Sequence, residues 1–543
     1  MGAIGIVLFM LAAVIVSAII VRVLPRAIPT PLVQIALGAV IAAVSDQEVP
    51  LDPEVFFLLL LPPLLFLDGW RIPTPALRQD KVMILELALG LVFLTVLGVG
   101  FFIHWMIPAM PYPVAFALAA IVSPTDPVAV SAITARAPVP KRFLHVLEGE
   151  SLLNDASGLV CFRFAVAAAI TGSFALTSAV LTFVQLALIG VATGIALTIG
   201  VMRATHWISR RFGEESGSHV LVSLLIPFLA YEAAEHLGGS GILAAVAAGI
   251  TMSFVELSGS VRSGTRVQRR AVWDTVHFAL NGIVFVLLGE QFPAIIADAA
   301  SAMRATNKSE VWWLIVYVLA INLALAALRF GWVWISLRVG ARLKAARGQP
   351  AEDPDFRLVA AMSLAGVRGA ITLAGVLTLP LALPDGSPFP ARDLAVFLAA
   401  GVIIASLLAS SILLPRLLHG LAPSPSDTES DGVERARIAA ARAAIPAVEE
   451  ALHEMASGQQ DADLYAQAAR RVMDVYRRRI EGHTLDQNAE RIRKCDEIER
   501  QLRLTGLRTE REALFALARA GELSNADSRR LVHEIDLLEE RFR

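Results

Sequence analysis

Long apolar stretches recur along most of the chain, and short clusters of polar residues separate them. A helix needs about 20 mostly apolar residues to cross the hydrocarbon core of a bilayer. Thirteen stretches meet this requirement, so the pattern predicts thirteen transmembrane helices. Their expected ranges are 3–21, 28–45, 53–70, 82–107, 113–134, 147–172, 177–202, 218–235, 240–256, 273–296, 311–337, 358–382 and 393–415.

Cationic residues between these stretches indicate how the helices are oriented. An odd number of crossings puts the two ends of the chain on opposite sides of the membrane. Short cytoplasmic loops are enriched in Lys and Arg, and with the N-terminus outside about 21 such residues fall in inner loops, against about three in outer loops. We therefore expect an outer N-terminus, a cytoplasmic C-terminus and a multi-pass protein of the cell inner (plasma) membrane.

The composition divides the chain into a lipid-soluble body and a polar end. Only 18% of the 543 residues are charged, against about 25% in soluble domains, and about 44 of the charged residues lie after Pro423. The sequence predicts a transmembrane domain at 1–421, a linker at 422–432 and a cytoplasmic helical domain at 433–543. In that last domain Gly482 and Gly506 are the expected breaks between helices, and Ser524 is the expected cap of the final helix.

Charge and cysteine content narrow the function. A net charge of −2 offers no basic surplus for a phosphate backbone, so we expect no nucleic-acid partner. The two cysteines, Cys161 and Cys495, are too few and too far apart for a disulfide framework or a structural zinc site. We expect no cofactor.

A carboxylate between two prolines lies in the middle of the fifth predicted helix. The run Ser-Pro-Thr-Asp-Pro occupies 123–127. Proline removes a backbone donor and clashes with the preceding turn, so the helix is expected to break near Thr125 and Asp126. Unwound backbone is tolerated in a membrane only where protein or water satisfies it, and its free carbonyls can bind a cation there.

Two further predicted helices carry buried charge. The run Gly-Glu-Ser-Leu-Leu-Asn-Asp at 149–155 places Ser151 and Asp155 on one helix face, and Glu150 and Asn154 on the neighbouring face. The run Gly-Val-Arg-Gly-Ala at 366–370 places Arg368 between small residues. An intramembrane arginine needs a carboxylate partner, and Glu150 is the expected partner of Arg368.

Each of these polar residues has a structural role as its alternative. The flanking prolines favour a functional Asp126, and the hydroxyl of Ser151 on the same face favours a functional Asp155. Glu150, Asn154 and Arg368 are interpreted as scaffold rather than ligands. The roles of three further charged residues are not decided by the sequence. Asp68 is either a ligand or an interfacial carboxylate, and Arg163 and Arg329 are snorkelling or paired structural cations.

The candidate residues together predict a site of hard oxygen ligands. Two carboxylates, a hydroxyl and exposed carbonyls suit a small alkali cation better than a soft metal. Desolvated carboxylates also hold protons more tightly. A site that binds either a proton or a cation, and that faces each side in turn, exchanges one for the other.

The motifs resemble those of the bacterial sodium/proton antiporters of the monovalent cation:proton antiporter-1 family, relatives of the animal sodium/proton exchangers. The resemblance rests on Ser-Pro-Thr-Asp-Pro-Val at 123–128, Gly-Glu-Ser-Leu-Leu-Asn-Asp at 149–155, Gly-Val-Arg-Gly-Ala at 366–370 and Leu-Pro-Pro-Leu-Leu-Phe at 61–66. It implies an all-α fold of about 13 transmembrane helices in inverted repeats with discontinuous helices, a homodimer and alternating access. The polar end of the chain resembles the cytoplasmic extension of the longer bacterial members.

The resemblance also implies a role for each residue. Asp155 would bind the proton and the ion, with Asp126, Ser151 and the Thr125 carbonyl as its co-ligands for Na⁺. Glu150 and Arg368 would form an ion pair, and Asn154 would brace the unwound helix; Asp68 is a possible additional ligand. Asn154 in place of a second aspartate implies electroneutral one-for-one exchange, used for pH and sodium homeostasis.

Several functions remain open from the sequence alone. The transported cation is expected to be Na⁺, with Li⁺ as a further substrate, and K⁺/H⁺ exchange is the alternative, because sequence does not set a cavity to tenths of an ångström. From other classes, an intramembrane aspartic protease would use Asp126 and Asp155 as a dyad, and a cation channel would conduct without proton coupling. The motifs favour a transporter rather than an enzyme.

Overall fold

The computed structural model describes residues 3–23, 28–44, 53–71, 81–126, 130–131, 141–172, 176–213, 215–257, 263–305, 312–346, 355–419, 428–456, 462–481, 487–520, 523 and 525–542. All regular elements in these ranges are helical, apart from one isolated bridge between Ala382 and Pro388. The expected all-α class is therefore confirmed.

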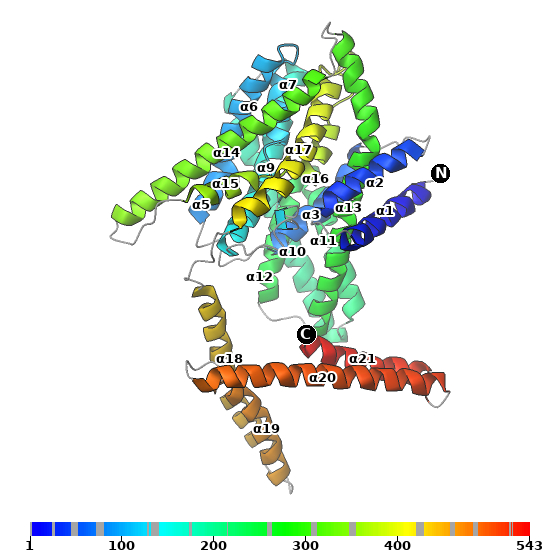
Figure 1. The fold of residues 1–543 in the computed structure, drawn as a ribbon, viewed down its shortest axis with the longest axis vertical. Coiled ribbons are helices and arrows are strands. Elements are labelled where there is room, and N and C mark those ends of the chain that lie inside the picture. The colour runs from blue at the N-terminus through cyan, green and yellow to red at the C-terminus, as the bar shows by residue number, and fades with distance from the viewer. Residues whose placement is uncertain are drawn as a thin grey trace. The chain divides into compact units, whose positions relative to one another are not determined.

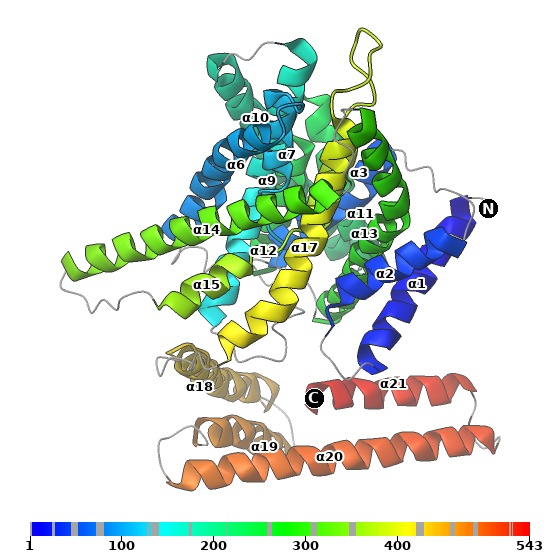
Figure 2. The same cartoon turned by 45° about the horizontal axis from the view of Figure 1, so that its top comes forward.

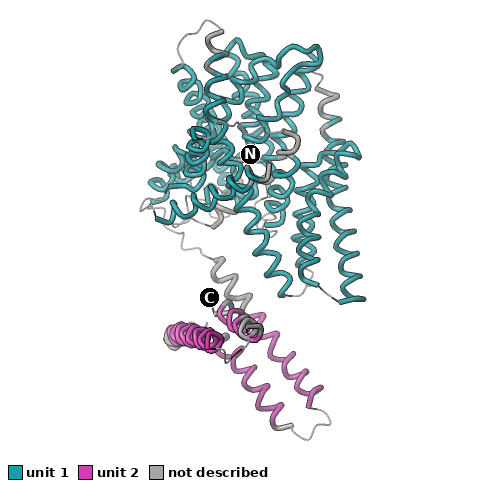
Figure 3. Tube along the Cα trace, turned by 90° about the vertical axis from the view of Figure 1, so that its right-hand side faces the viewer, with its two compact units in different colours: residues 1–422 teal, residues 423–543 magenta. Residues whose placement is uncertain are grey.

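The chain divides into two compact units, residues 1–422 and 423–543, coloured teal and magenta in Figure 3. Residues 420–427 lie outside the described part of the chain. The first helix of the second unit, α18, begins at Thr428. This helix begins inside the range expected for the linker, 422–432, because the Ala- and Arg-rich sequence after Thr428 favours a helix.

The first unit is an assembly of mostly apolar helices of different lengths (Figures 1 and 2). In chain order they are α1 Ala3–Val23, α2 Thr30–Val44, α3 Pro53–Arg71, α5 Lys81–Leu85, the π-helix η1 Glu86–Leu91, α6 Val92–Met106, α7 Tyr112–Ile121, α9 Lys141–Thr171, α10 Leu176–Phe212, α11 Ser216–His236, α12 Gly241–Leu257, α13 Ser263–Ala305, α14 Trp312–Ala346, α15 Phe356–Leu364, α16 Ala370–Leu377 and α17 Arg392–Leu418.

Many of these helices have the length and composition of membrane spans. Within the described residues, seven long apolar helices qualify, and four shorter apolar helices accompany them. Their outward faces carry large apolar side chains such as Leu188, Leu323 and Phe101, which is the arrangement a lipid environment requires. The number of complete crossings stays a prediction.

Two predicted helices are interrupted. The fifth ends at Ile121, and residues 123–126 are not helical, as the two prolines predict. The twelfth, expected as one helix over 358–382, is divided into α15 and α16 by a non-helical stretch over 365–369. This second break contains no proline. It contains Gly366 and Gly369, and glycine is a poor helix former because folding costs it more conformational entropy than other residues.

Close helix packing holds the interrupted elements inside the unit. Helix α7 is almost wholly buried and is rich in alanine, which lets α6, α9 and α17 approach it.

Helices α2 and α13 approach each other closely at two glycines. A Cβ on Gly38 would lie 2.0 Å from the Val286 carbonyl oxygen, and a Cβ on Gly289 would lie 1.9 Å from the Ile35 carbonyl oxygen. Small residues allow such backbone approach in membrane helices.

The second unit consists of α18 Thr428–Ala456, α19 Ala462–Glu481, α20 Gln487–Arg519 and α21 Asn525–Phe542. Helix α18 packs on α19, and α20 packs on α21. Arg511 of α20 donates to Asp536 of α21 at 2.9 Å, and this hydrogen bond together with the one to Glu539 raises the pKa of the guanidinium.

Two expectations for this unit lie outside the described residues, and one is wrong. Gly482 and Ser524 are not described. Gly506 does not end a helix, because it lies inside α20. A helical glycine costs only about 1 kcal/mol relative to alanine, and the many strong helix formers of α20 offset it.

The close contact between α2 and α13 predicts that two Gly→Ala substitutions shift the thermal unfolding midpoint in opposite directions. Gly289→Ala should lower the thermal unfolding midpoint, because overpacking costs about 1–3 kcal/mol. Gly331→Ala on α14, where a Cβ would meet no atom within 4 Å, should raise it by the equivalent of about 0.5–1 kcal/mol. Thermal unfolding of both purified variants in the same detergent checks this, and equal shifts would contradict the packing.

Candidate functional site

The two interrupted helices meet at their breaks. The backbone N–H of Asp126, beyond the end of α7, donates to the carbonyl of Val367, between α15 and α16, at 2.7 Å. Gly369 makes the crossing possible, because a Cβ there would lie 2.0 Å from the Asp126 Oδ2 atom. Each unwound segment therefore satisfies part of the other's backbone in a place without bulk water.

Arg368 lies at this crossing and is buried, with 5% of its surface exposed. Its Nε donates to the Val122 carbonyl at 2.8 Å, and its Nη1 donates to the Gly366 carbonyl. These oxygens belong to the C-terminal ends of α7 and α15, where the helix dipoles place partial negative charge. The guanidinium thus neutralises two helix ends at once.

The expected ion pair between Glu150 and Arg368 is wrong. Glu150 on α9 is fully buried and pairs instead with Arg329 of α14, whose Nη2 donates to Oε2 at 2.7 Å and whose Nη1 donates to Oε1. Arg329 also donates from Nε to the Met362 carbonyl at 3.0 Å. Because backbone carbonyls already bind the Arg368 guanidinium, the bidentate partner of Glu150 is Arg329 of α14. Of the two roles left open for Arg329, pairing is the one found; Arg163 is likewise paired, with Glu235.

Asn154 bridges the unwound segment and the buried ion pair. Its Nδ2 donates to Thr125 Oγ1 at 3.0 Å, and the Thr125 hydroxyl in turn donates to Glu150 Oε1 at 3.4 Å. The expected contact between Asn154 and the broken helix is therefore present. This amide acts on the chain by hydrogen bonding and does not titrate.

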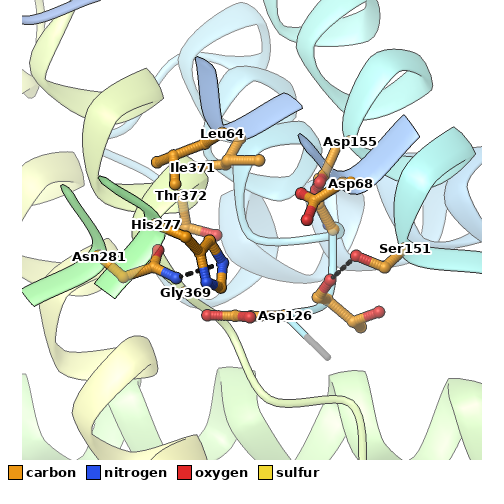
Figure 4. Close-up of a pocket in the computed structure, with 12 residues that line it drawn as sticks. Leu64, Asp68, Asp126, Ser151, Asp155, His277, Asn281, Gly369, Ile371 and Thr372 are labelled. Carbon is orange, nitrogen blue, oxygen red and sulfur yellow. Dashed lines mark hydrogen bonds between the residues drawn. The ribbon is translucent and has the colours of Figure 1, made fainter. Parts of the chain in front are cut away.

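A small polar cavity adjoins the crossing, with a volume of about 30 Å³ (Figure 4). This volume exceeds the roughly 10–15 Å³ that one water molecule needs. Three carboxylates line it, from three elements: Asp68 of α3, Asp126 of the unwound segment and Asp155 of α9. The structure thus brings Asp68, whose position was undecided from the sequence, to the same cavity as the other two.

Hydroxyl and carbonyl oxygens complete one wall of the cavity. Ser151 Oγ donates to the Thr125 carbonyl at 2.7 Å (Figure 4). Ser151, Thr125 and Asp155 are each at most 5% exposed. Since the serine hydrogen points to the carbonyl, the serine lone pairs remain available to a positive charge.

The negative charge of the carboxylates in the cavity needs a neutralising partner. Several carboxylates in a desolvated place cannot all stay ionised unless a proton or a cation neutralises them. The ligands are hard oxygens, which suit alkali cations and protons rather than soft metals. The arrangement is suited to binding and releasing small cations.

Sequence reasoning missed three polar residues of the lining. His277 and Asn281 of α13 share one face, with His277 Nε2 and Asn281 Nδ2 2.9 Å apart, and Thr372 lies on α16. The available signal was the pair of polar residues at i and i+4 within the apolar stretch 273–296. It does not reveal which distant helix the pair faces.

An apolar helical body with broken helices crossing beside a carboxylate-lined cavity defines a membrane transporter of small cations. Comparisons with known proteins agree. The family model "Sodium/hydrogen exchanger, transmembrane" matches residues 9–420. The chain belongs to this sodium/hydrogen exchanger family.

Relatives span nearly the whole chain. It is 39% identical over 538 residues to the uncharacterized Na⁺/H⁺ exchanger YjcE of Escherichia coli K12, covering 98% of this chain and 97% of that protein. It is 38% identical over 542 residues to the sodium, potassium, lithium and rubidium/H⁺ antiporter of Bacillus subtilis, covering 99% and 77%. The sodium proton antiporter MjNhaP1 from Methanocaldococcus jannaschii shares the fold, with a TM-score of 0.60 at 18% identity, covering 77% of this chain and 98% of that one.

Family membership establishes the general activity. The protein is a multi-pass membrane antiporter that exchanges monovalent cations for protons, and it is not an enzyme. The protease and channel alternatives are therefore excluded.

The corrected ion pair predicts a specific pattern of rescue. Arg329→Gln should cost about 3–5 kcal/mol of stability, because it leaves Glu150 buried and unpaired. Adding Glu150→Gln should recover much of this loss, since both charges are then gone. Unfolding measurements on the single and double variants in detergent check the cycle.

Arg368 supplies the matched comparison. Arg368→Gln should also destabilise the protein, because two helix ends lose their donor, yet Glu150→Gln should not rescue it. Rescue of Arg368→Gln but not of Arg329→Gln by Glu150→Gln would contradict the observed pairing.

Proposed function

We propose that the protein exchanges Na⁺, and also Li⁺, for H⁺ in a one-for-one ratio at the carboxylate-lined cavity. The observation that carries the proposal is the convergence of Asp155, Asp126 and Ser151 beside the Thr125 carbonyl at a break in two helices. Cation and proton compete there for the same negative charge. Transport follows because the site faces the two sides of the membrane in turn.

Asp155 is the proposed carrier of the proton and the principal ligand of the cation. It is almost fully buried on the continuous helix α9, so its carboxylate has little water to stabilise its charge. Asp126, Ser151 and the Thr125 carbonyl complete the Na⁺ site in this proposal. Asp68, on the α3 side of the same cavity, is a further oxygen along the route to it.

The supporting residues are proposed to hold the site rather than to bind the ion. The Glu150–Arg329 pair is internally neutral, and Asn154 fixes the Thr125 side chain. A neutral Asn154 beside Asp155 leaves one carboxylate fewer to titrate than an aspartate would. This supports an electroneutral cycle, in which one proton replaces one Na⁺.

Exchange of K⁺ is the second candidate. The relative from Bacillus subtilis is named as an antiporter of sodium, potassium, lithium and rubidium, and it is similar over 99% of this chain. A cavity formed partly by unwound backbone can adjust to cations of different radius. Selectivity is therefore best measured with all the alkali cations in one assay.

The cellular setting is part of the same proposal. The loop cations support an inner-membrane protein with its N-terminus outside and its C-terminal unit in the cytoplasm. We propose a homodimer that serves pH and sodium homeostasis.

Proton flux in acid-loaded vesicles tests the proposed exchange. Adding Na⁺ or Li⁺ outside should make the interior of wild-type proteoliposomes alkaline, and Asp155→Asn should reduce the rate to background. Asp298→Asn changes an exposed carboxylate of α13 that does not line the cavity, and this variant should exchange normally. Normal exchange by Asp155→Asn would contradict the site.

Voltage separates the stoichiometries in the same vesicles. A one-for-one exchange should give the same rate and end point at any clamped potential. A cycle that moves one net charge would instead shift its equilibrium about 50-fold per 100 mV.

Two serines of α9 form a matched pair for the ligand set. Ser151 faces the cavity, whereas Ser157 donates to the Ala88 carbonyl at 2.7 Å, outside it. Ser151→Ala should raise the apparent KM for Na⁺ about 10-fold or more, because a polar contact to a charge contributes about 1.5–3 kcal/mol. Ser157→Ala should leave this KM near wild type; equal effects in Na⁺-dependent flux would contradict a ligand role for Ser151.

We also propose that the C-terminal unit regulates exchange or supports the dimer. Deletion of residues 424–543 should change the pH dependence, the rate or the dimer content, measured by flux and by light scattering. A truncated protein that matches the full chain in all three would contradict this role.

A further inference from the structure

A second, much larger cavity lies in the membrane body, away from the carboxylates. It has a volume of about 1220 Å³ and is lined mainly by α10 and α12, with Leu153 of α9 and His219 of α11. This is more than the roughly 300–1,000 Å³ of pockets that take drug-sized molecules. The cavity therefore has room for a large ligand.

Helix packing explains why the cavity exists. Helices α10 and α12 approach tightly at one end, where a Cβ on Gly190 would lie 2.5 Å from the Ser240 carbonyl oxygen and one on Gly194 2.3 Å from that of Ala244. Gly190 faces Ser240, and Gly194, four residues further along α10, faces Ala244, four residues further along this segment of the chain. The two helices therefore run in the same direction. The lining begins beside the glycine contact and continues toward the C-terminal ends of both helices.

The walls of the cavity change character along its length. On α10 the lining residues from Val191 to Met202 are apolar, and over α12 they are apolar apart from Thr251. The apolar part of α10 spans about 16 Å, from the 1.5 Å rise per residue. One leaflet of the hydrocarbon core is about 15 Å thick, half of the bilayer value. The apolar section thus matches the length of lipid acyl chains in one leaflet.

The far end of the cavity is basic. Arg203, His206 and Arg210 line it from the last turns of α10, and the buried His219 accompanies them, with its Nε2 2.7 Å from Ser209 Oγ. The lining contains no aspartate or glutamate among the described residues. Cationic pockets between membrane helices at headgroup depth attract anionic lipid.

An exposed tryptophan supports the placement of this basic end at the membrane interface. Trp207 lies on α10 between His206 and Arg210, and 60% of its surface is exposed. Tryptophan is enriched where the headgroups meet the hydrocarbon core. The basic residues therefore lie at headgroup level while the apolar walls lie at acyl-chain level.

We propose that this cavity binds one anionic glycerophospholipid, with its headgroup phosphate between Arg203 and Arg210 and its acyl chains between α10 and α12. The charge of the basic end selects an anionic headgroup, and the apolar length selects the chains of one leaflet. Leu153 places the lipid against α9, the helix that carries Ser151 and Asp155 toward the ion cavity. The site is separate from the proposed exchange site and does not rest on its ligand assignment.

Native mass spectrometry of the full-length protein in detergent tests the proposal. Phosphatidylglycerol and phosphatidylcholine with the same acyl chains are the probes, and glycerol phosphate is the soluble competitor. Phosphatidylglycerol should bind at one copy per chain and at least about fivefold more tightly than phosphatidylcholine, while glycerol phosphate should not displace it. Equal binding of the two lipids, or displacement of phosphatidylglycerol by glycerol phosphate, would overturn the proposal.

Matched variants locate the lipid. Arg210→Gln should weaken phosphatidylglycerol binding about fivefold, the contribution of one cation near an anionic headgroup. Arg211→Gln, the exposed neighbour that does not line the cavity, should leave binding unchanged. Equal effects of the two variants would mean a general surface attraction and would overturn the site.

A second pair tests the acyl section without a change of charge. Ile199→Trp should place a bulky ring in the path of the acyl chains and reduce binding of both lipids about tenfold. Leu188→Trp on the same helix, at a position 66% exposed and outside the cavity, should have no effect. Unchanged binding by Ile199→Trp, with the variant shown to be folded by its thermal unfolding, would overturn the placement of the chains.

Discussion

Unpaired backbone groups in the middle of an apolar body are the constraint on which the rest of this structure depends. Breaking α7 and the α15–α16 pair leaves N–H and C=O groups without helical partners, where water cannot satisfy them. Hydrogen bonds at the two breaks satisfy some of these groups. The Asp126 N–H donates to the Val367 carbonyl, and the Arg368 guanidinium donates to the carbonyls of Val122 and Gly366. Without these contacts the unwound segments would not be stable in the membrane.

The same constraint produces the site. Because the Thr125 backbone is not helical, its carbonyl is free to accept from Ser151, and the Asp126 side chain reaches the cavity beside Asp155. The Glu150–Arg329 pair contributes no net charge, so the charge of the cavity is set by the aspartates. In the proposed exchange a proton or a cation neutralises them, and competition between the two would couple their movements.

The sequence predicts some of this architecture well, for reasons that are local. Two prolines on either side of Asp126 forecast the first break, and helical spacing puts Ser151 and Asp155 on one face. The second break was missed because Gly366 and Gly369 interrupt a helix less strongly than proline does. The partner of Glu150 was assigned incorrectly because spacing orders residues within one helix but does not determine whether α14 or the α15–α16 break lies opposite. For the same reason His277 and Asn281 were not connected to the site.

Proton release on cation binding is the most direct test of the claim that cation and proton compete for one cavity. Purified protein in weakly buffered detergent solution, with a pH indicator, should release one proton for each Na⁺ bound, and Asp155→Asn should release none. Sodium binding by the wild-type protein without proton release would contradict the account.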